Sequence, residues 1–365
     1  MRIIEATTWR VEFLLREPYT IAYQSYDRAT NYFLRLVTDE GLVGNGCAAP
    51  APEVTGEQHA DTERALGDAA ARLHGAEIML AGSVDKCLAE LLHGCPAAAA
   101  ALDMARYDLL AQKANLPLYQ FLGAHREEVM TSVTIGICGL QETRHRAQDL
   151  IRQGFRALKI KGGVDVEGDI ERLQALRSDL GAAIVLRFDA NQGYTVEATM
   201  RWLSAISDCG IEMLEQPTPA GDTSALHALR AAIDTLPPSS SRLGVPALMA
   251  DESLLGVRDA VDLAARGDFN AYNIKLMKAG GIDPARAIAA IAHAHGIPAM
   301  VSCMDEAALG IAAGLHFALS SRAVTWVDLD GHLDLIDDPT AGAVLLRDGN
   351  LSPNGKPGLG VELTA

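Results

Sequence analysis

Eight short apolar runs, mostly separated by segments of helical length, fill the stretch from residue 132 to residue 330. They are SVTIGI (132–137), ALKIKG (157–162), AIVLRFDA (183–190), IEMLEQ (211–216), ALMADE (247–252), AYNIKLM (271–277), PAMVSCM (298–304) and VTWVDLD (324–330). Strands that alternate with helices predict parallel β/α units, and eight such units close into a barrel. The fold class that we expect is therefore α/β, with a TIM-type barrel as its main domain.

The segments on either side of the barrel have a different pattern. Residues 2–14 and 31–38 alternate apolar with polar side chains, whereas residues 60–125 are rich in Ala and Leu at helical spacing. Strands followed by helices indicate an α+β domain. We expect an α+β capping domain at 1–125, the barrel at 126–330 and a C-terminal segment at 331–365. The Pro- and Ser-rich interval 236–246 is predicted to be a surface loop before the fifth barrel strand.

Lysines stand at the carboxyl-terminal ends of two of the runs, where barrel enzymes place their chemistry. Lys159 and Lys161 are two apart in one strand, so both should point into the barrel mouth. The structural alternative is that both amines reach out to solvent from the strand end. Lys275 ends the sixth run and should lie across the mouth from Lys161, which permits a 1,1-proton transfer by two bases on opposite faces of one carbon. Lys278 lies three residues beyond Lys275, so by strand alternation it would point to the opposite face, and we assign it to a loop.

Three carboxylates, Asp189, Glu215 and Asp251, end the third, fourth and fifth runs. Neighbouring strand ends would bring them together, and they would repel one another without a cation. Oxygen ligands with no His or Cys favour Mg²⁺, which we expect as one ion per subunit. Asn191 is two residues beyond Asp189, so by strand alternation its side chain should point the same way, and we expect it to support the metal or its water. The alternative is that the three acids cap the following helices. Lysines beside such a metal predict removal of a proton next to a carboxylate.

A series of motifs follows in a fixed order along nearly the whole chain. They are VTGE (54–57), ALDMARYDLLAQ (101–112), SVTIGI, KIKGG, DANQGY, EQP, ADES, NIKLMKAGG (273–281) and DLDG (328–331). Their order and spacing resemble the enolase superfamily, specifically its muconate-lactonising subgroup, and within it the dipeptide epimerases, including those that act on L-Ala-D/L-Glu. The resemblance implies a modified TIM (β/α)7β barrel with an N-terminal α+β capping domain on which the C-terminal segment packs.

The resemblance also implies roles for the site residues. Lys161 would be the acid/base, and Lys159 would support the substrate carboxylate and lower the pKa of Lys161. Glu252 would stand behind the metal ligands. The implied reaction is Mg²⁺-dependent epimerisation of a dipeptide at the α-carbon of its C-terminal residue, through an enolate, with Lys275 as the second base.

Substrate contacts are implied at the first and eighth strands. In dipeptide epimerases an acid pair such as Asp328 and Asp330 binds the N-terminal ammonium of the substrate. Thr134 and Ile135 match the end of the first strand, where the peptide is held.

Substrate specificity is implied in two loops of the capping domain, at 18–26 and 49–57. Epimerases for L-Ala-D/L-Glu tend to carry an arginine in the first loop, and here the position holds Gln24, which cannot offer bidentate charge pairing. A neutral, hydrophobic or cationic second residue is therefore favoured at least as much as Glu. Asp27, Glu53 and Asp305 could serve a cationic side chain. We expect Asp305 and Glu306 to face the pocket rim, with a helix cap as the alternative for both.

Composition excludes several other classes of protein. The formal net charge of -16 argues against a nucleic-acid or anionic-membrane surface. The six cysteines have no metal-binding spacing, and the N-terminal segment has no signal-peptide pattern, so we expect reduced thiols and a cytoplasmic location. No segment has the apolar length of a membrane span.

His293 and His295 do not share a helix face and are expected at the surface. We expect a homo-oligomer with a small-molecule substrate.

Two other readings remain open at this point. A muconate cycloisomerase, an o-succinylbenzoate synthase or an N-acylamino-acid racemase could use the same scaffold, although the first two have no ammonium for Asp328 and Asp330 to bind. A non-catalytic metal-binding barrel is the remote alternative, and it would need neither Lys161 nor Lys275.

Overall fold

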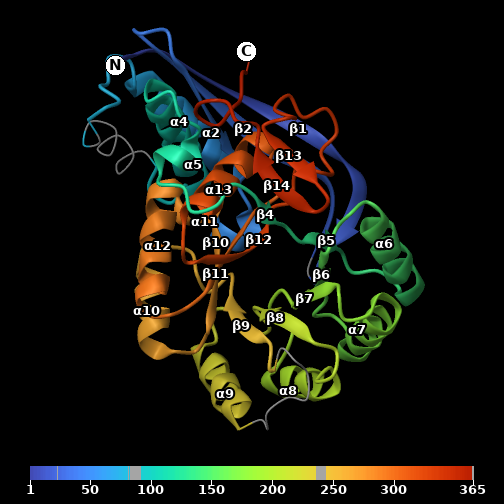
Figure 1. Cartoon of the computed structure of the whole chain (residues 1–365). Coiled ribbons are helices and arrows are strands. Elements are labelled where there is room, and N and C mark those ends of the chain that lie inside the picture. The colour runs from blue at the N-terminus through green and yellow to red at the C-terminus, as the bar shows by residue number, and fades with distance from the viewer. Residues whose placement is uncertain (23, 81, 83–91, 236–243, 364–365) are drawn as a thin grey trace.

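The computed structural model describes the chain except for residues 23, 81, 83–91, 236–243 and 364–365. Its centre is a sheet of eight strands in the order β12-β11-β10-β9-β8-β7-β6-β5. The strands are β5 (Val133–Ile135), β6 (Ala157–Lys161), β7 (Val185–Asp189), β8 (Ile211–Glu215), β9 (Ala247–Ala250), β10 (Ala271–Lys275), β11 (Ala299–Ser302) and β12 (Val324–Asp328). The amide of Ser132 donates to the carbonyl of Val327 at 3.1 Å, which brings the two edges together. All eight predicted runs therefore form strands of one parallel barrel (Figure 1).

Helices surround the barrel strands on the outside (Figure 1). They are α6 (Leu140–Arg152), α7 (Val166–Leu180), α8 (Val196–Ala205), α9 (Thr223–Asp234), α10 (Val257–Arg266), α11 (Leu276–Ala279), α12 (Ile282–Ala294) and α13 (Ala308–Ser320). Side chains cap several of them, as where Thr195 accepts a hydrogen bond from the Ala198 amide at the start of α8. At least one helix follows each of the first seven barrel strands, whereas β12 leads into the C-terminal segment. This is the (β/α)7β arrangement.

The capping domain combines a three-stranded antiparallel sheet with helices. Its elements are β1 (Ile3–Thr20), β2 (Ser25–Thr38), β3 (Val43–Ala48), α1 (Pro52–Thr55), α2 (His59–Arg72), α4 (Pro96–Lys113) and α5 (Leu118–Phe121). The backbone of β3 lies directly against α4, because a Cβ on Gly46 would come within 1.8 Å of the carbonyl oxygen of Ala101. The expected strands are present, and both extend beyond the alternating segments that predicted them.

The C-terminal segment returns to the capping domain. Its hairpin, β13 (Val344–Arg347) and β14 (Asn350–Pro353), pairs with β4 (Val129–Met130). Further on, the amide of Leu118 donates to the carbonyl of Gly358, and the amide of Leu359 donates to the buried carboxylate of Asp108, both at 2.8 Å. Both chain ends lie on the capping side of the molecule (Figure 1).

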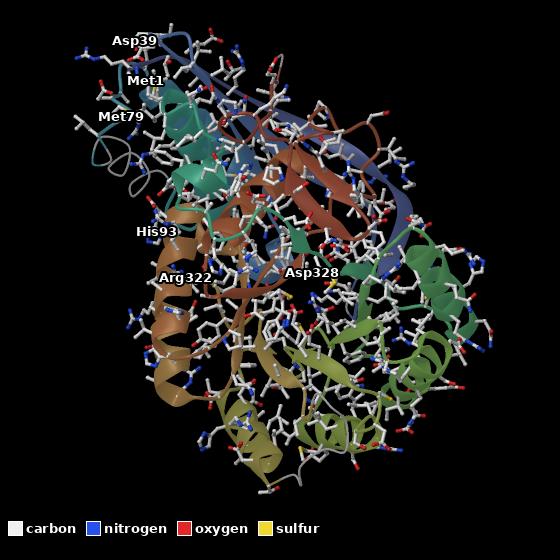
Figure 2. The ribbon with its side chains drawn as sticks, viewed as in Figure 1. Met1, Asp39, Met79, His93, Arg322 and Asp328 are labelled. Carbon is white, nitrogen blue, oxygen red and sulfur yellow. The ribbon has the colours of Figure 1, made fainter. Side chains whose placement is uncertain are left out.

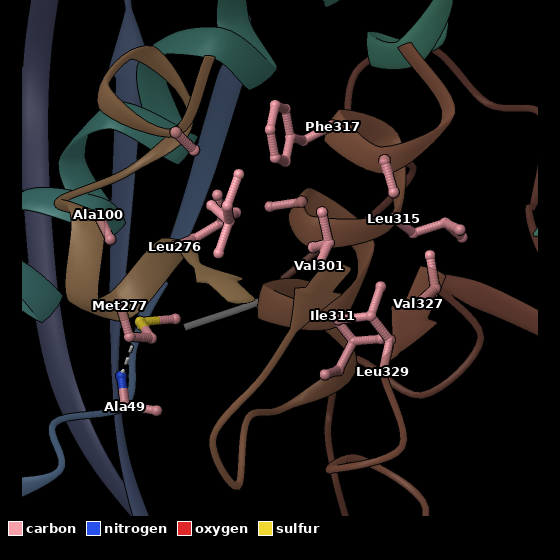
Figure 3. Close-up of a cluster of buried hydrophobic side chains, with 14 of the residues drawn as sticks. Ala49, Ala100, Leu276, Met277, Val301, Ile311, Leu315, Phe317, Val327 and Leu329 are labelled. Atoms are coloured by element: carbon pink, nitrogen blue, oxygen red, sulfur yellow. Dashed lines mark hydrogen bonds between the residues drawn. The ribbon is translucent and has the colours of Figure 1, made fainter. Parts of the chain in front are cut away.

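Apolar side chains join the capping domain to the barrel. Figure 3 shows Ala49 and Ala100 of the capping domain next to Leu276 and Met277 of α11, with the buried residues of β11, β12 and α13 on the other side of α11. The amide of Ala49 also contacts the sulfur of Met277 at 3.4 Å. Almost every residue of α13 is buried, because this helix lies between the barrel and the capping domain. The capping domain is thus held over one end of the barrel.

Other expectations concern thiols and surfaces. The five described cysteines, Cys47, Cys95, Cys138, Cys209 and Cys303, form no disulfide. His293 and His295 are exposed, as predicted. The predicted loop 236–246 lies outside the described residues apart from its last three positions. None of the described helices combines the length and apolar character that crossing a membrane requires.

Candidate active site

The carboxyl-terminal ends of the barrel strands open into a cavity of about 820 Å³ below the capping domain. Most of the predicted site residues line it: Gln24, Thr134, Ile135, Lys159, Lys161, Asn191, Asp251, Glu252, Lys275, Asp305, Asp328 and Asp330. Asp189 and Glu215 are fully buried beside it. Figure 2 places Asp328 near the centre of the molecule, where the barrel strands converge. Side chains that are far apart in sequence therefore share one cavity.

The two lysines of β6 point to the carboxylates of neighbouring strands. Lys161 is in register with Asp189 on β7, and its Nζ donates to Asp189 Oδ2 at 2.7 Å. The Nζ of Lys159 lies 2.8 Å from Glu215 Oε2 and 3.0 Å from Asp328 Oδ2. The side chains are 4% and 13% exposed for Lys159 and Lys161 respectively. Neither amine reaches out to solvent, so the structural alternative for this pair is wrong.

The three predicted metal ligands lie at adjacent strand ends. Asp189 ends β7 and Glu215 ends β8 in register with it, while Asp251 directly follows β9. Each is at most 1% exposed. They do not cap the following helices, because the N-cap residues of α8, α9 and α10 are Thr195, Asp222 and Gly256. The helix-cap alternative is therefore wrong for all three.

Burial and charge oppose each other in this cluster. Burial disfavours the charged amine of Lys159, but the carboxylates of Asp328, Glu215 and Asp189 outweigh it and hold the pKa of Lys159 well above its usual value. The pKa of Lys275 is likewise raised against its burial, chiefly by Asp251. Burial and the charge of Asp189 raise the pKa of Glu215 to about 7. The acids therefore hold these two lysines in their protonated form.

Lysine amines lie between the carboxylates, and no group of three side chains among the described residues is already arranged as a metal site. Three buried oxygens nevertheless have no hydrogen-bond partner, namely Oε2 of Glu215, Oε2 of Glu252 and Oδ1 of Asn191. The Glu215 oxygen lies near Lys159 without hydrogen-bonding geometry. Buried oxygens without a hydrogen bond are costly, and hard oxygen donors suit a small divalent cation. These residues therefore fit a metal such as Mg²⁺.

The acid pair at the end of β12 divides into two environments. Asp328 accepts hydrogen bonds from Ser132 Oγ at 2.5 Å and from Lys159 Nζ, so both of its oxygens are engaged. Asp330 accepts from the amide of Thr134 at 2.6 Å through Oδ2. Burial, and then the charge of Asp328, raise the pKa of Asp330 to about 7. Its other oxygen, Oδ1, has only a long contact with Cys303 Sγ at 3.9 Å, so Asp330 is the member of the pair with an oxygen more open to the cavity.

An acidic and aromatic wall forms the rim of the cavity. Tyr19 and Tyr26 stack with ring centroids 5.2 Å apart. The hydroxyl of Tyr19 donates to Asp305 Oδ2 at 2.8 Å, and that of Tyr26 donates to Glu53 Oε1 at 2.5 Å. Gln24 lies exposed in the loop between β1 and β2. The sequence indicates Asp305, Glu53 and Gln24 as residues near the pocket, whereas it indicates Tyr19 and Tyr26 only through the specificity loop at 18–26 that contains them.

Two sequence assignments are wrong. Glu306 does not face the rim: it is 2% exposed and accepts a hydrogen bond from the Met304 amide inside the turn before α13. Lys278 is not a loop residue, because α11 begins directly after β10 and turns its side chain inward. Its Nζ donates to the carbonyl of Asp251 at 2.6 Å and also contacts the carboxylate. The signal for this position is the three-residue spacing from Lys275, which is helical and not strand-like.

Comparisons with known proteins agree with this architecture. A family model described as mandelate racemase / muconate lactonizing enzyme, N-terminal domain, matches residues 3–123, and one described as enolase C-terminal domain-like matches residues 142–365. The chain therefore belongs to the mandelate racemase and muconate lactonizing enzyme family of the enolase superfamily. Curated relatives over nearly its whole length are epimerases and racemases, and the chain is accordingly an enzyme of the isomerase class.

Within that class the chain is similar to dipeptide epimerases. It is 42% identical to the L-Lys-D/L-Arg epimerase of Methylococcus capsulatus, over 99% of both chains. It is 41% identical to the enzyme of the same name from Desulforapulum autotrophicum, again over 99% of both chains. A crystal structure of the Methylococcus capsulatus dipeptide epimerase complexed with Mg and the dipeptide L-Arg-D-Lys matches with a TM-score of 0.90, at 41% identity and 99% coverage of both chains.

Proposed function

We propose that this protein is a Mg²⁺-dependent dipeptide epimerase that inverts the α-carbon of the C-terminal residue of cationic dipeptides. The observation that carries the proposal is the placement of Lys161 and Lys275. They end β6 and β10, and β7, β8 and β9 lie between those strands. Strands four positions apart in a barrel of eight face each other across its axis, and both lysines line the same cavity. A carbon held between them is open to one amine on each face.

Asp189, Glu215 and Asp251 would hold the metal, since they supply buried oxygen ligands at adjacent strand ends. Mg²⁺ bound there would supply positive charge that stabilises the negative charge developing on the substrate carboxylate. The carboxylates would then hold Lys159 and Lys275 in the protonated form less strongly, because the cation would neutralise part of the carboxylate charge.

The two lysines would move the proton. For one stereoisomer, neutral Lys161 takes the α-proton and becomes an ammonium, which leaves an enolate of the substrate. Lys275, already an ammonium, then gives its own proton to the opposite face, and the configuration inverts. For the other stereoisomer the two lysines exchange roles. Lys159, fixed beside Glu215 and Asp328, supports the substrate carboxylate as a buried cation.

The N-terminal ammonium of the substrate would bind at Asp330. Both oxygens of Asp328 already accept hydrogen bonds, so Asp328 adds charge more than a direct contact. Thr134 fixes the Asp330 carboxylate through its amide, and Ile135 lines the cavity beside it. An N-acylated substrate has no ammonium, and an N-succinyl group would bring a second carboxylate toward this acid pair. This feature favours a free dipeptide over an N-acylamino acid.

The rim supports a cationic side chain in the dipeptide. Glu53 and Asp305 supply negative charge, and the stacked rings of Tyr19 and Tyr26 line the same cavity with the kind of side chain that attracts cations. Gln24 brings no positive charge to pair with an acidic side chain. The two full-length relatives named for L-Lys-D/L-Arg support the same choice.

A dipeptide library in D₂O tests this proposal. Each L-Xaa-L-Yaa dipeptide is incubated with the Mg²⁺-loaded enzyme, and deuterium uptake at the α-carbon is read by mass spectrometry. We expect the highest kcat/KM for dipeptides of Lys and Arg, well above that for L-Ala-L-Glu. A preference for L-Ala-L-Glu beyond about tenfold would contradict the assigned substrate class, because an arginine of the cavity lining, such as Arg28, and not Glu53 or Asp305 would then set the specificity. Equal turnover of N-acetylated and free L-Lys-L-Arg would contradict dipeptide recognition altogether.

Three wider expectations also remain proposals: a capping unit at 1–125 with the barrel at 126–330 and the returning segment at 331–365, a cytoplasmic location, and assembly into a homo-oligomer. Size-exclusion chromatography with light scattering would measure the assembly state.

A further inference from the structure

A buried polar network lies behind Lys161, and the chemistry proposed above does not use it. Arg172 of α7 donates through Nη2 to the carbonyl oxygen of Lys161 at 2.8 Å, and it forms an ion pair with Asp169. The second oxygen of Asp169 accepts from the amide of Gly163 at 2.8 Å and from the hydroxyl of Tyr194 at 2.5 Å. Asp169, Arg172 and Tyr194 are each at most 4% exposed.

The network joins the two loops that follow β6 and β7. These loops touch through their backbones: a Cβ on Gly163 would lie 2.0 Å from the carbonyl oxygen of Ala190, and one on Gly193 would lie 2.1 Å from that of Gly163. Gly163 has a φ of 101°, a conformation that side chains disfavour. Asp169 contacts one loop through the Gly163 amide and the other through Tyr194. The end of β6, which carries Lys161, is thereby fixed against the loop that follows Asp189.

Stability alone does not explain such a network. A buried ion pair loses hydration that its own attraction often does not recover, so packed apolar side chains would serve the fold as well. Burial and the charge of Asp169 raise the pKa of Tyr194, which keeps its hydroxyl a donor. Every contact of the network toward the site falls on the backbone of Lys161 or of the loop after it, and none falls on Lys275.

We propose that Asp169, Arg172 and Tyr194 are positioning residues for Lys161 alone. They fix the Lys161 carbonyl and the glycine loop, and hence the direction in which the amine leaves β6 toward Asp189. The functional half of this proposal rests on the two-base epimerisation proposed above. If the positioning proposal holds, disturbing the network weakens proton transfer by Lys161 and leaves proton transfer by Lys275 intact. A general loss of stability would instead weaken proton transfer by both lysines.

The first arm of the test measures α-proton exchange in D₂O separately for the L,L and L,D forms of Lys-Arg. Lys161→Ala and Lys275→Ala identify which isomer each lysine deprotonates. Tyr194→Phe removes one hydroxyl without changing shape, and Arg172→Lys keeps the charge but loses the forked donors. For both variants we expect exchange of the Lys161 isomer to fall at least about tenfold, because small misplacements of a reacting group are costly. Exchange of the Lys275 isomer should stay near the wild-type rate.

Tyr272→Phe is the matched control. Tyr272 is a fully buried tyrosine of the barrel, and its hydroxyl donates to the Ala260 carbonyl at 3.1 Å. It should not reproduce the one-sided loss. If Tyr194→Phe and Arg172→Lys slow both isomers equally, or slow neither, the network does not position Lys161.

The second arm needs no substrate and separates this proposal from the proposed function. Crystal structures of the wild type and of Tyr194→Phe compare the place of the Lys161 amine. We expect the hydrogen bond from Lys161 Nζ to Asp189, 2.7 Å here, to be lost or displaced in the variant while the contact of Lys275 with Asp251 stays. Unchanged Lys161 geometry overturns the positioning proposal. Absence of exchange by the wild type on every dipeptide would overturn the proposed function, while this arm still decides the positioning role.

Discussion

Lys161 and Lys275 would perform the same chemistry on opposite faces of one carbon. Replacing either by Ala should stop epimerisation in both directions, because inversion needs one lysine to take the proton and the other to give one. Each variant should still exchange the α-proton of one isomer with solvent, and the two variants should exchange different isomers. Chiral chromatography with mass spectrometry of the recovered dipeptide measures both. Normal turnover by both variants would show that the two bases are misassigned.

Asp330 gives a pH-dependent prediction. Its pKa is raised to about 7 in the free protein, so it loses negative charge as the pH falls through that value. An ammonium binds the ionised form, so KM should rise below about pH 7. Asp330→Asn should lower kcat/KM on the order of 10–100-fold, because a charge-assisted hydrogen bond is lost, and should flatten this pH dependence. A variant with an unchanged pH profile of KM would mean that another group binds the ammonium.

The elements that carry the site were predictable because their signals are periodic. Apolar runs alternating with segments of helical length predict all eight barrel strands, and barrel geometry then places Lys161, Asp189 and Glu215 together. Errors arose where a strand ends and periodicity changes. Strand alternation assigns Lys278 to a loop although it lies in α11, and Glu306 turns inward before α13. Strand alternation also does not apply at Asn191, because this residue follows the end of β7 and its backbone has a φ of 41°.

Contacts between remote elements left no signal in the sequence. The stacking of Tyr19 on Tyr26 depends on a hairpin whose register is not encoded locally. The hydrogen bonds of Arg172 and Tyr194 with Lys161 and Asp169 depend on how α7 packs against two loops. Sequence alone also leaves open whether the Lys159 amine reaches solvent or points into the site, because the answer depends on its neighbours in space.

At the level of elements, close packing of β3 on α4 gives a stability prediction. Gly46→Ala would bring a methyl group to 1.8 Å from the Ala101 carbonyl, and backbone cannot move aside cheaply. We expect a loss on the order of 2 kcal/mol or more in the free energy of unfolding. Gly67→Ala is the control, because Gly67 lies in α2 with open space around it and should be neutral or stabilising by up to about 1 kcal/mol. Urea unfolding measures both, and equal values for the two variants would contradict this packing.

On the scale of the whole molecule, His316 should make the stability of the folded protein sensitive to acid, because it joins α13 to α5. Its Nδ1 accepts from the amide of Tyr119 at 2.9 Å, and burial lowers its pKa to about 3. The unfolded chain takes up this proton near pH 6.5 and the folded chain does not, so stability is full above that pH and falls as the pH drops. Between about pH 6.5 and pH 5 the loss is about 2 kcal/mol. His316→Gln keeps an acceptor and should lose this part of the pH dependence in urea unfolding at the two pH values. An unchanged slope would place the acid sensitivity elsewhere.

The most direct measurement is α-deuterium uptake into L-Lys-L-Arg in D₂O, made on one enzyme sample before EDTA treatment, after it, and after Mg²⁺ is restored. We expect the L,D product to carry one deuterium at the C-terminal α-carbon, with uptake abolished by EDTA and recovered with Mg²⁺. The reason is that Asp189, Glu215 and Asp251 would hold the cation that stabilises the enolate, and that the returning proton would come from a second, solvent-exchanged lysine. Full activity in a thoroughly metal-stripped sample, or an L,D product without deuterium, would contradict two-base epimerisation at a metal site.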